Sequence, residues 1–428
     1  MRFLRTLSLT TRGCRVLLQI VALVLVAMLG FPPLARAQQP APSAQTEQEV
    51  IQELLKRLQK LEARVLELEA ERGKPAAPVV APSPAPPAPS VEEPAREESH
   101  MGSRLGPSLN IRGFTDVTFR GSNQTGATTS FAVGQFNLFV TSQLSERFNF
   151  LSEIVFEAGD DNVFIVDVER LLLQYSHNDY FNFAVGRYHT AIGYYNTAYH
   201  HSTWLQTAIG RPFLFAFEDE GGILPIHEVG ASISGRLPSG SLGLHYIVEV
   251  GNGRASRTPL DEAIQNVVDE NNRKAVNVAF FARPQALRGL QTGFSVYHDR
   301  LAPDAMPKIG RTILAAHVVF ARPNFEWLNE ALLVRHAPQG TPRIFNTPGF
   351  YTQISRRFGS YRPYLRYEYV NAPNNEPLFS DVGLRHGPSV GLRYEPIESL
   401  AFKLQYDRVG RRNLPGMNIL TTQFAFTF

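Results

Sequence analysis

Cysteine is almost absent from this 428-residue sequence, and the single one, Cys14, lies in a segment that we expect to be removed. A mature chain without cysteine has no disulfide framework and no thiol chemistry. Neither sign of charge predominates, because the formal net charge is only +3 with 19% charged residues. This balance argues against a binder of nucleic acid or of other polyanions.

The first 37 residues have the pattern of a secretory signal peptide. Four arginines precede an apolar run over residues 16–30, and Ala35-Arg36-Ala37 supplies a small-x-small cleavage site. A membrane anchor is the alternative, but the run is shorter than the roughly 18 to 20 residues that a spanning helix needs. We therefore expect residues 1–37 to be cleaved and the protein to be exported.

Residues 47–71 are predicted to form a short helical coiled coil. The apolar residues recur at alternating intervals of three and four, which is the spacing of a coiled-coil seam and not the wider stripe of a single amphipathic helix. The residues at a and d favour a dimer, whereas the segment around Arg57 and Glu62 resembles a motif of short trimeric coiled coils, so the number of chains stays open. The seam consists of Ile51, Leu54, Leu58, Leu61, Val65 and Leu68.

A tract rich in proline and alanine occupies residues 72–107. Proline removes backbone donors and favours an extended chain, so we expect a semi-rigid spacer, with plain disorder as the alternative. A spacer of this kind suits a protein that crosses a gap.

The body, residues 108–428, lacks helical periodicity and is rich in β-branched and aromatic residues. We expect all-β structure in which short polar turns alternate with longer loops. The combination indicates a transmembrane antiparallel β-barrel of about 16 strands, preceded by the helical coiled coil. The strands are expected near 109–120, 130–143, 148–158, 162–175, 180–188, 226–236, 240–250, 274–282, 288–298, 311–321, 325–335, 349–358, 361–370, 381–394, 399–407 and 418–428.

The clearer strands alternate between an apolar and a polar face, as segment 399–407 shows. A soluble sandwich also alternates, but its edges are usually rich in lysine, and this body has only Lys274, Lys308 and Lys403. Two segments fit the alternation poorly, 168–175 and 324–335. We expect β-bulges in both of them.

The sequence ends on an aromatic alternation formed by Phe424, Phe426 and Phe428. This end resembles the terminal signature of Gram-negative outer-membrane proteins. The resemblance implies recognition by the barrel-assembly machinery. In a closed barrel the last strand pairs with the first, so that no unpaired edge remains.

The longest connector, residues 189–225, carries too many aromatic side chains to lie open in water, and we expect it to fold back. Porins of the sixteen-stranded trimeric class narrow the lumen with the loop after strand five, and this chain resembles them. Its prefix is similar to that of trimeric porins with a periplasmic coiled coil, some of them in the phosphate-selective group. The resemblance implies a homotrimer among outer-membrane lipid and lipopolysaccharide, with the coiled coil in the periplasm. It implies passive diffusion of small hydrophilic solutes, and no cofactor.

The two halves of the body differ in charge. Residues 108–272 contain 9 basic and 18 acidic residues, whereas residues 273–428 contain 20 basic and 10 acidic residues. Opposite walls should therefore create a transverse field across a constriction. We expect the constriction loop to present Trp204, Glu218, Asp219 and Glu220, and the facing wall to present Arg366, Arg385, Arg393 and Lys403. Arginine suits anions, but the acidic half offsets it, so a general or weakly selective channel is favoured.

Two other functions stay open. An enzyme or a metal site would have to use the adjacent His200 and His201, together with Glu218 or His227, but no third metal ligand occurs at a suitable spacing, so we predict neither. The second is a structural role, in which a trimeric barrel anchors a coiled coil that reaches the cell wall.

Overall fold

The computed structural model describes residues 108–158, 163–199, 203–218, 220–254, 268–303 and 306–428. The expected signal peptide (1–37), coiled coil (47–71) and linker (72–107) lie outside these residues and stay predictions. No helix in the described part of the chain is both long enough and apolar enough to span a membrane.

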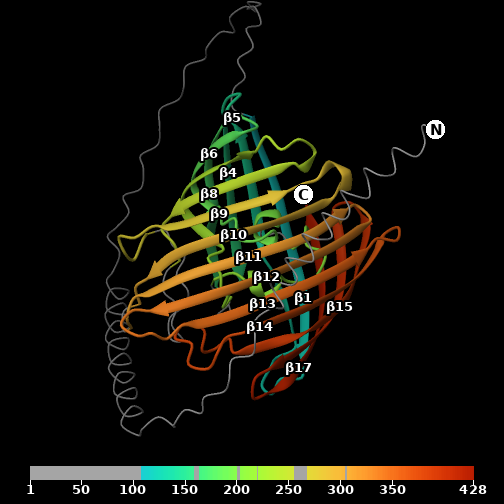
Figure 1. Ribbon diagram of the computed structural model, residues 1–428. Coiled ribbons are helices and arrows are strands. Elements are labelled where there is room, and N and C mark those ends of the chain that lie inside the picture. The colour runs from blue at the N-terminus through green and yellow to red at the C-terminus, as the bar shows by residue number, and fades with distance from the viewer. Residues whose placement is uncertain (1–107, 159–162, 200–202, 219, 255–267, 304–305) are drawn as a thin grey trace, which may run out of the picture. The chain divides into compact units, whose positions relative to one another are not determined.

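One antiparallel sheet makes up almost all of the described structure, and its strands run obliquely around a closed wall (Figure 1). Neighbouring strands in the sequence are neighbours in the sheet. The strands are β1 (Ser108–Ser122), β2 (Ser130–Val133), β3 (Phe136–Gln143), β4 (Phe148–Ala158), β5 (Phe164–Asn178), β6 (Phe181–His189), β7 (His227–Arg236), β8 (Leu244–Gly251), β9 (Ala275–Ala282), β10 (Leu290–Leu301), β11 (Ile309–Arg322), β12 (Phe325–Pro338), β13 (Phe345–Arg356), β14 (Tyr361–Asn371), β15 (Leu384–Ile397), β16 (Leu400–Arg411) and β17 (Leu414–Thr427).

The wall has sixteen strands, because β2 and β3 form one strand with a short break. Both pair with β1, and only Gly134 and Gln135 separate them. At the break the Asp116 side chain occupies the space where a Gly134 side chain would be, since a Cβ there would lie 2.2 Å from Asp116 Oδ1. The predicted number and order of the strands are therefore confirmed.

The last strand closes the wall on the first, as the aromatic end predicted. β17 pairs with β1 from Thr427 opposite Phe114 to Ile419 opposite Ser122. The backbone of Phe428 continues this ladder, since its carbonyl accepts from Gly113 N at 2.8 Å and its N–H donates to Gly113 O at 3.0 Å. No edge is left between these two strands.

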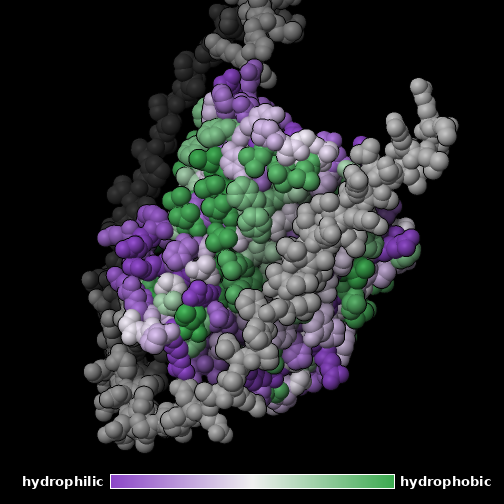
Figure 2. Space-filling model, viewed as in Figure 1, coloured by the Kyte–Doolittle hydropathy of each residue, from purple (hydrophilic) through white to green (hydrophobic). Residues whose placement is uncertain are grey.

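The outer face of the wall is apolar along the middle of the strands. Large side chains such as Phe294, Trp327 and Leu404 point outward and are 43–53% exposed. Figure 2 shows hydrophobic residues gathered over the middle of the visible wall, with hydrophilic residues toward its rims. Such a belt suits contact with lipid, because every backbone group in a closed barrel is paired within the sheet.

One of the two expected bulges is present. β4 and β5 shift register between Glu153 and Ile154, which leaves Glu169 as the extra residue. The bulge expected in 324–335 is wrong, since β12 pairs with β11 and β13 without interruption. The alternation there is obscured because Leu328 and Val334 face the inside of the barrel and are buried against apolar neighbours.

An apolar cluster lies inside the barrel. It joins the loop between β6 and β7 to the inner face of β9 to β14. The buried side chains that form it are at most 7% exposed. The loop carries a single helical turn, α3 (Tyr195–Ala198), and a 3-10 turn, η1 (Phe213–Phe215). We refer to residues 190–226 as the lumen loop. Its folded position confirms that the long connector folds back.

Candidate functional site: the lumen loop and the walls that hold it

Aromatic packing holds the first half of the lumen loop against the wall. The Tyr195 ring lies 4.5 Å from that of Tyr199, 5.8 Å from that of Phe215 and 6.0 Å from that of Tyr351 on β13. Tyr195, Phe215 and Tyr351 are at most 2% exposed. Each buried aromatic removes roughly 150–250 Å² from water, so this cluster supplies a large part of the energy that folds the loop inward.

Acidic side chains of the wall accept hydrogen bonds from the backbone N–H groups of the loop. Glu249 on β8 accepts from Ala191 N at 2.9 Å. Glu330 on β12 accepts from Tyr194 N at 2.5 Å and Tyr195 N at 2.8 Å. These bonds fix the first half of the loop to β8 and β12 and pair backbone N–H groups that would otherwise be buried without partners.

Basic side chains on β14 to β16 donate to the carbonyl groups of the loop. Lys403 Nζ on β16 donates to Thr203 O at 2.5 Å, and Arg393 Nη1 on β15 donates to Trp204 O at 2.6 Å. Arg366 Nη1 on β14 donates to Gly210 O at 2.9 Å. These three side chains are 3–5% exposed, so they are largely covered by the loop.

Side chains of both signs thus hold the backbone of the lumen loop. Carboxylates such as Glu330 accept from its N–H groups, and basic side chains such as Arg366 donate to its carbonyl groups. Burying polar backbone without partners would be costly, and these side chains supply the partners. The loop is thus fixed across the lumen.

The four basic residues predicted to line the pore all come from β14, β15 and β16, but their surroundings differ. Arg366, Arg393 and Lys403 are bound to loop carbonyls. Arg385 is less buried and places its guanidinium 4.2 Å above the Phe213 ring. Trp204, predicted on the constriction loop, lies with its ring 5.9 Å from the Arg393 guanidinium.

Glu218, the first residue of the acidic triplet, contacts His227 and not these basic residues. It accepts from His227 N at 3.0 Å and lies 3.1 Å from His227 Nδ1. Glu220 is exposed, and Asp219 lies outside the described residues. Glu218 lies on the expected loop, and its partner His227 is the first residue of β7.

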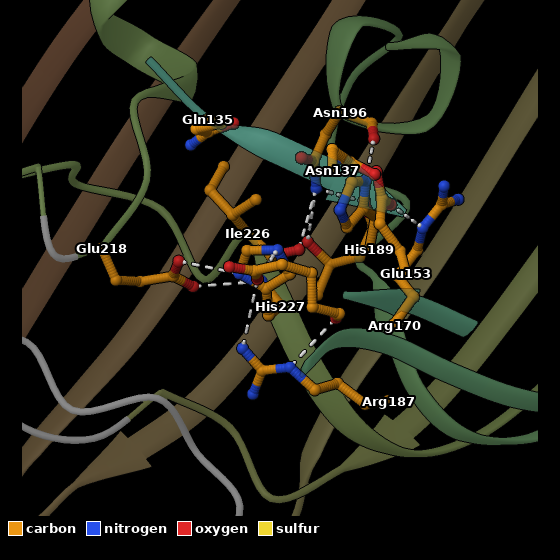
Figure 3. A network of polar contacts seen from close by, with 12 residues as sticks. Gln135, Asn137, Glu153, Arg170, Arg187, His189, Asn196, Glu218, Ile226 and His227 are labelled. Atoms are coloured by element: carbon orange, nitrogen blue, oxygen red, sulfur yellow. Dashed lines mark hydrogen bonds and ion pairs between the residues drawn. The ribbon is translucent and has the colours of Figure 1, made fainter. Parts of the chain in front are cut away.

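His227 lies between two carboxylates, and Figure 3 shows its contact with one of them, Glu218. Its Nε2 is 3.0 Å from Glu169 Oε2, and its Nδ1 is 3.1 Å from Glu218 Oε2. Burial by itself would raise the pKa of Glu218, but the His227 imidazole and the Arg254 guanidinium outweigh burial and lower that pKa to about 2. Glu218 is therefore a carboxylate at neutral pH.

A second polar contact ties the two ends of the lumen loop together (Figure 3). Asn196 Nδ2 donates to Thr190 O at 2.9 Å and to Ile226 O at 3.1 Å. His189 Nδ1 lies 3.0 Å from Asn196 O. Sequence reasoning missed Asn196, Glu249 and Glu330, although a lone acid in the apolar segment LNEALLV around Glu330 is a recognisable signal.

Lumen-facing side chains on β1, β3 and β5 are less covered than those that hold the loop. Thr118, Phe139, Asp167 and Arg170 are half-buried and Arg120 is exposed. Arg170 bridges to Glu153 at 2.7 Å and lies 5.3 Å from the Phe139 ring. Both signs of charge thus occur along this part of the inner wall.

No group of three His, Cys, Asp or Glu side chains within the described ranges could hold a metal ion. His200 and His201, the candidates for such a site, lie outside those ranges.

Solved structures with the same arrangement of strands are outer-membrane channels. The anion-selective porin of Comamonas acidovorans aligns with a TM-score of 0.54 and 10% identity, over 75% of this chain and 100% of that one. The channel DcaP of Acinetobacter baumannii aligns with a TM-score of 0.51 and 11% identity, over 77% and 99%. This fold is the sixteen-stranded porin barrel. OmpF of Salmonella typhi, solved with daunomycin, has the same porin fold, with a TM-score of 0.51 and 10% identity over 76% and 98%.

No protein-family model matches the sequence, and no curated protein matches it either. At identities near 10% the structural likeness shows the porin fold alone. What the channel conducts has to be argued from its own residues.

Proposed function

We propose that this protein is a porin of the Gram-negative outer membrane, through which small hydrophilic solutes and ions diffuse passively. The observation that carries the proposal is the closed sixteen-stranded wall, apolar outside and charged inside, with a loop fixed across its interior. A barrel of this strand number leaves a lumen that side chains of the wall alone do not fill.

The path for solutes runs beside the lumen loop, along the inner face of β1 to β5. Arg120, Asp167 and Arg170 border it with both signs of charge, and Arg385 faces it from β15. Opposite charges across a narrow passage orient polar solutes and slow apolar ones. Because three of the four predicted basic residues are occupied by the loop, we propose weak ion selectivity, with Arg385 as its main cationic determinant.

The active form is proposed to be a homotrimer. Phe164 and Ile165 point to opposite faces of β5 and are 60% and 52% exposed, so one barrel leaves both faces of this strand end uncovered. A second copy of the chain can cover such a surface, and the seam from Ile51 to Leu68 adds a coiled coil that we place in the periplasm. The partners in the membrane are lipid and lipopolysaccharide. The barrel-assembly machinery is proposed to recognise the terminal Phe428.

Reconstitution into a planar bilayer tests the channel. We expect stepwise currents, and uptake into liposomes that rises linearly with solute concentration unless a site binds the solute. Folded protein that inserts into the bilayer but carries no current would contradict the proposal.

The second candidate, a tether to the cell wall, is favoured by the predicted coiled coil and spacer at 47–107. Deletion of residues 47–107 separates the two functions. A channel should keep its conductance per barrel after the deletion, whereas a tether should lose its association with cell-wall fragments in a pull-down.

A further inference from the structure

A small cavity lies on the short-turn side of the lumen loop. It has a volume of about 160 Å³, room for about five water molecules. The loop covers it with Ala191, Tyr194 and Ala198, and the inner faces of β8 to β11 form the rest of its wall. None of the side chains that hold the loop through charged hydrogen bonds lines this cavity.

Three polar side chains in its lining form a chain. Arg283 Nε donates to Gln291 Oε1 at 2.9 Å, and Gln291 Nε2 lies 3.2 Å from His317 Nε2. Because the amide nitrogen of Gln291 can only donate, His317 Nε2 accepts and the proton of a neutral imidazole sits on Nδ1. His317 Nδ1 is thus a donor, and it is buried with no hydrogen-bond partner.

One further donor in the lining lacks a partner among the described residues. Ser295 Oγ on β10 is buried without a hydrogen bond, and Ser295 is 4% exposed. Arg283 is exposed at the edge of the cavity, where its guanidinium also stacks on the Phe281 ring at 4.9 Å. Buried polar atoms are nearly always paired, so unpaired donors beside a cavity indicate a missing acceptor.

The two remaining polar side chains of the lining, Tyr194 and Thr197, are also donors, and the Thr197 hydroxyl donates to Tyr194 O at 3.0 Å. Burial, with the nearby carboxylates of Glu326 and Glu330, raises the pKa of Tyr194, so its phenol stays protonated. Glu330 and Glu249 do not line the cavity, and both accept hydrogen bonds from loop N–H groups. The cavity therefore offers donors and one cation, but no free carboxylate.

We infer that this cavity is a binding site for a small monocarboxylate, held by Arg283, Ser295 and His317. The alkyl part of the ligand would rest on the apolar side chains of Ala191, Ala198, Ile247 and Ala279. Inorganic phosphate shares the oxyanion chemistry but leaves these apolar atoms without contact, so the carboxylate is the better fit. The site would make the proposed channel retain such solutes, and in this respect it rests on the proposed function.

Isothermal titration calorimetry on the full folded protein in detergent micelles tests the site. The probes are sodium butyrate, inorganic phosphate and the neutral amide butyramide. We expect one butyrate per chain and weaker binding of the other two. Arg283→Gln should weaken butyrate binding roughly tenfold or more, since a hydrogen bond to a charged group is lost.

Arg322→Gln is the matched control. Arg322 also lies at the short-turn rim, is also exposed and also stacks on a Phe two residues earlier, with its guanidinium 5.1 Å from the Phe320 ring, but it does not line the cavity. Its replacement should leave the affinity unchanged. Ala279→Leu, which fills the cavity, should abolish binding while Arg283 remains.

Heat-modified mobility and circular dichroism show which variants are folded, and Ser295→Ala provides a milder change than Arg283→Gln. Equal affinity in Arg283→Gln and wild type, phosphate binding tighter than butyrate, or no butyrate binding would overturn the inference. Because binding is measured without a membrane, the two proposals fail separately. Binding without current contradicts the channel, and current without binding contradicts the site.

Discussion

Glu330 on β12 accepts a hydrogen bond from the backbone N–H of Tyr195 at 2.8 Å, although 135 positions separate the two residues in the chain. The same carboxylate accepts from Tyr194 N at 2.5 Å and from the Tyr351 hydroxyl at 2.7 Å. One acidic side chain thus joins the helical turn of the lumen loop to two strands of the wall.

Replacing this carboxylate should loosen the loop. In Glu330→Gln an amide NH₂ replaces one acceptor oxygen and leaves a loop N–H unpaired, at a cost of about 1–3 kcal/mol in unfolding free energy. We expect larger and noisier single-channel currents. Asp179→Asn is the control, because Asp179 forms only an exposed pair with Arg236 at a turn, and its currents should match wild type. Identical currents in both variants would show that Glu330 does not hold the loop.

The position of Gly193 should tolerate no side chain. Gly193 and Gly210 both have φ +73°, but a Cβ at Gly193 would lie 2.4 Å from Glu330 Oε2, whereas at Gly210 nothing lies within 4 Å. Both changes to alanine carry the strain of positive φ, roughly 1 kcal/mol. Gly193→Ala should lower the melting temperature further and expose the loop to protease. Equal effects of the two changes would contradict the tight contact with Glu330.

Ion preference should respond to Arg385 more than to Arg366. Arg385 is the less buried of the two, whereas Arg366 is bound to Gly210 O and to Glu368. Arg385→Glu should shift the reversal potential in a salt gradient toward cations. Arg366→Gln should mainly raise current noise, because it frees loop carbonyls. If neither variant shifts the ion preference, these basic residues do not determine the selectivity of the channel.

Acid should release the loop only at low pH. The pKa of Glu218 is lowered from 4.5 to about 2, so its stabilising contribution is complete above about pH 4.5 and is lost as the pH falls toward 2. We expect the part of the conductance that depends on Glu218 to be steady between pH 7 and 5 and to change below that range.

His227→Gln removes the main group that lowers the pKa of Glu218, so the acid transition should move to higher pH. Glu218→Gln has no carboxylate to titrate and should show no transition of this origin. An acid transition at the same pH in all three proteins would assign it to other groups.

The terminal aromatic residue should matter for assembly. The Phe428 ring covers Gly113 so closely that a Cβ there would lie 2.2 Å from its Cζ atom, and the Phe136 ring lies 6.0 Å away. Phe428→Ala uncovers this junction of the last strand with the first, so we expect slower folding into lipid and a lower yield of barrel. Phe131→Ala, which changes a Phe that is 75% exposed on β2, is the control. Equal folding rates would contradict a role of the terminal ring.

Much of the barrel could be predicted because strand signals are local. The strand near 399–407 shows its two faces in nine residues, and β16 is found at Leu400–Arg411. The loop expected at 189–225 is the lumen loop, since its many aromatic residues can be counted without a structure. β12 was misjudged because its inner face is apolar, and that face meets the loop instead of water.

The partners of the charged residues could not be predicted. Lys403 meets Thr203 O and Glu218 meets His227, and neither pairing has a signature in the sequence. A backbone carbonyl is the same chemical group at every residue, so nothing in the residue types marks Thr203 as the acceptor.

The sequence by itself determined that the body forms a closed wall with an apolar outside, because a period of two and the turn residues act over a few neighbours. Only the tertiary structure decided that acidic and basic side chains of the wall hold the lumen loop by its N–H and carbonyl groups. That outcome depends on the stagger and width of the barrel, which bring residues more than a hundred positions apart to within 3 Å of each other.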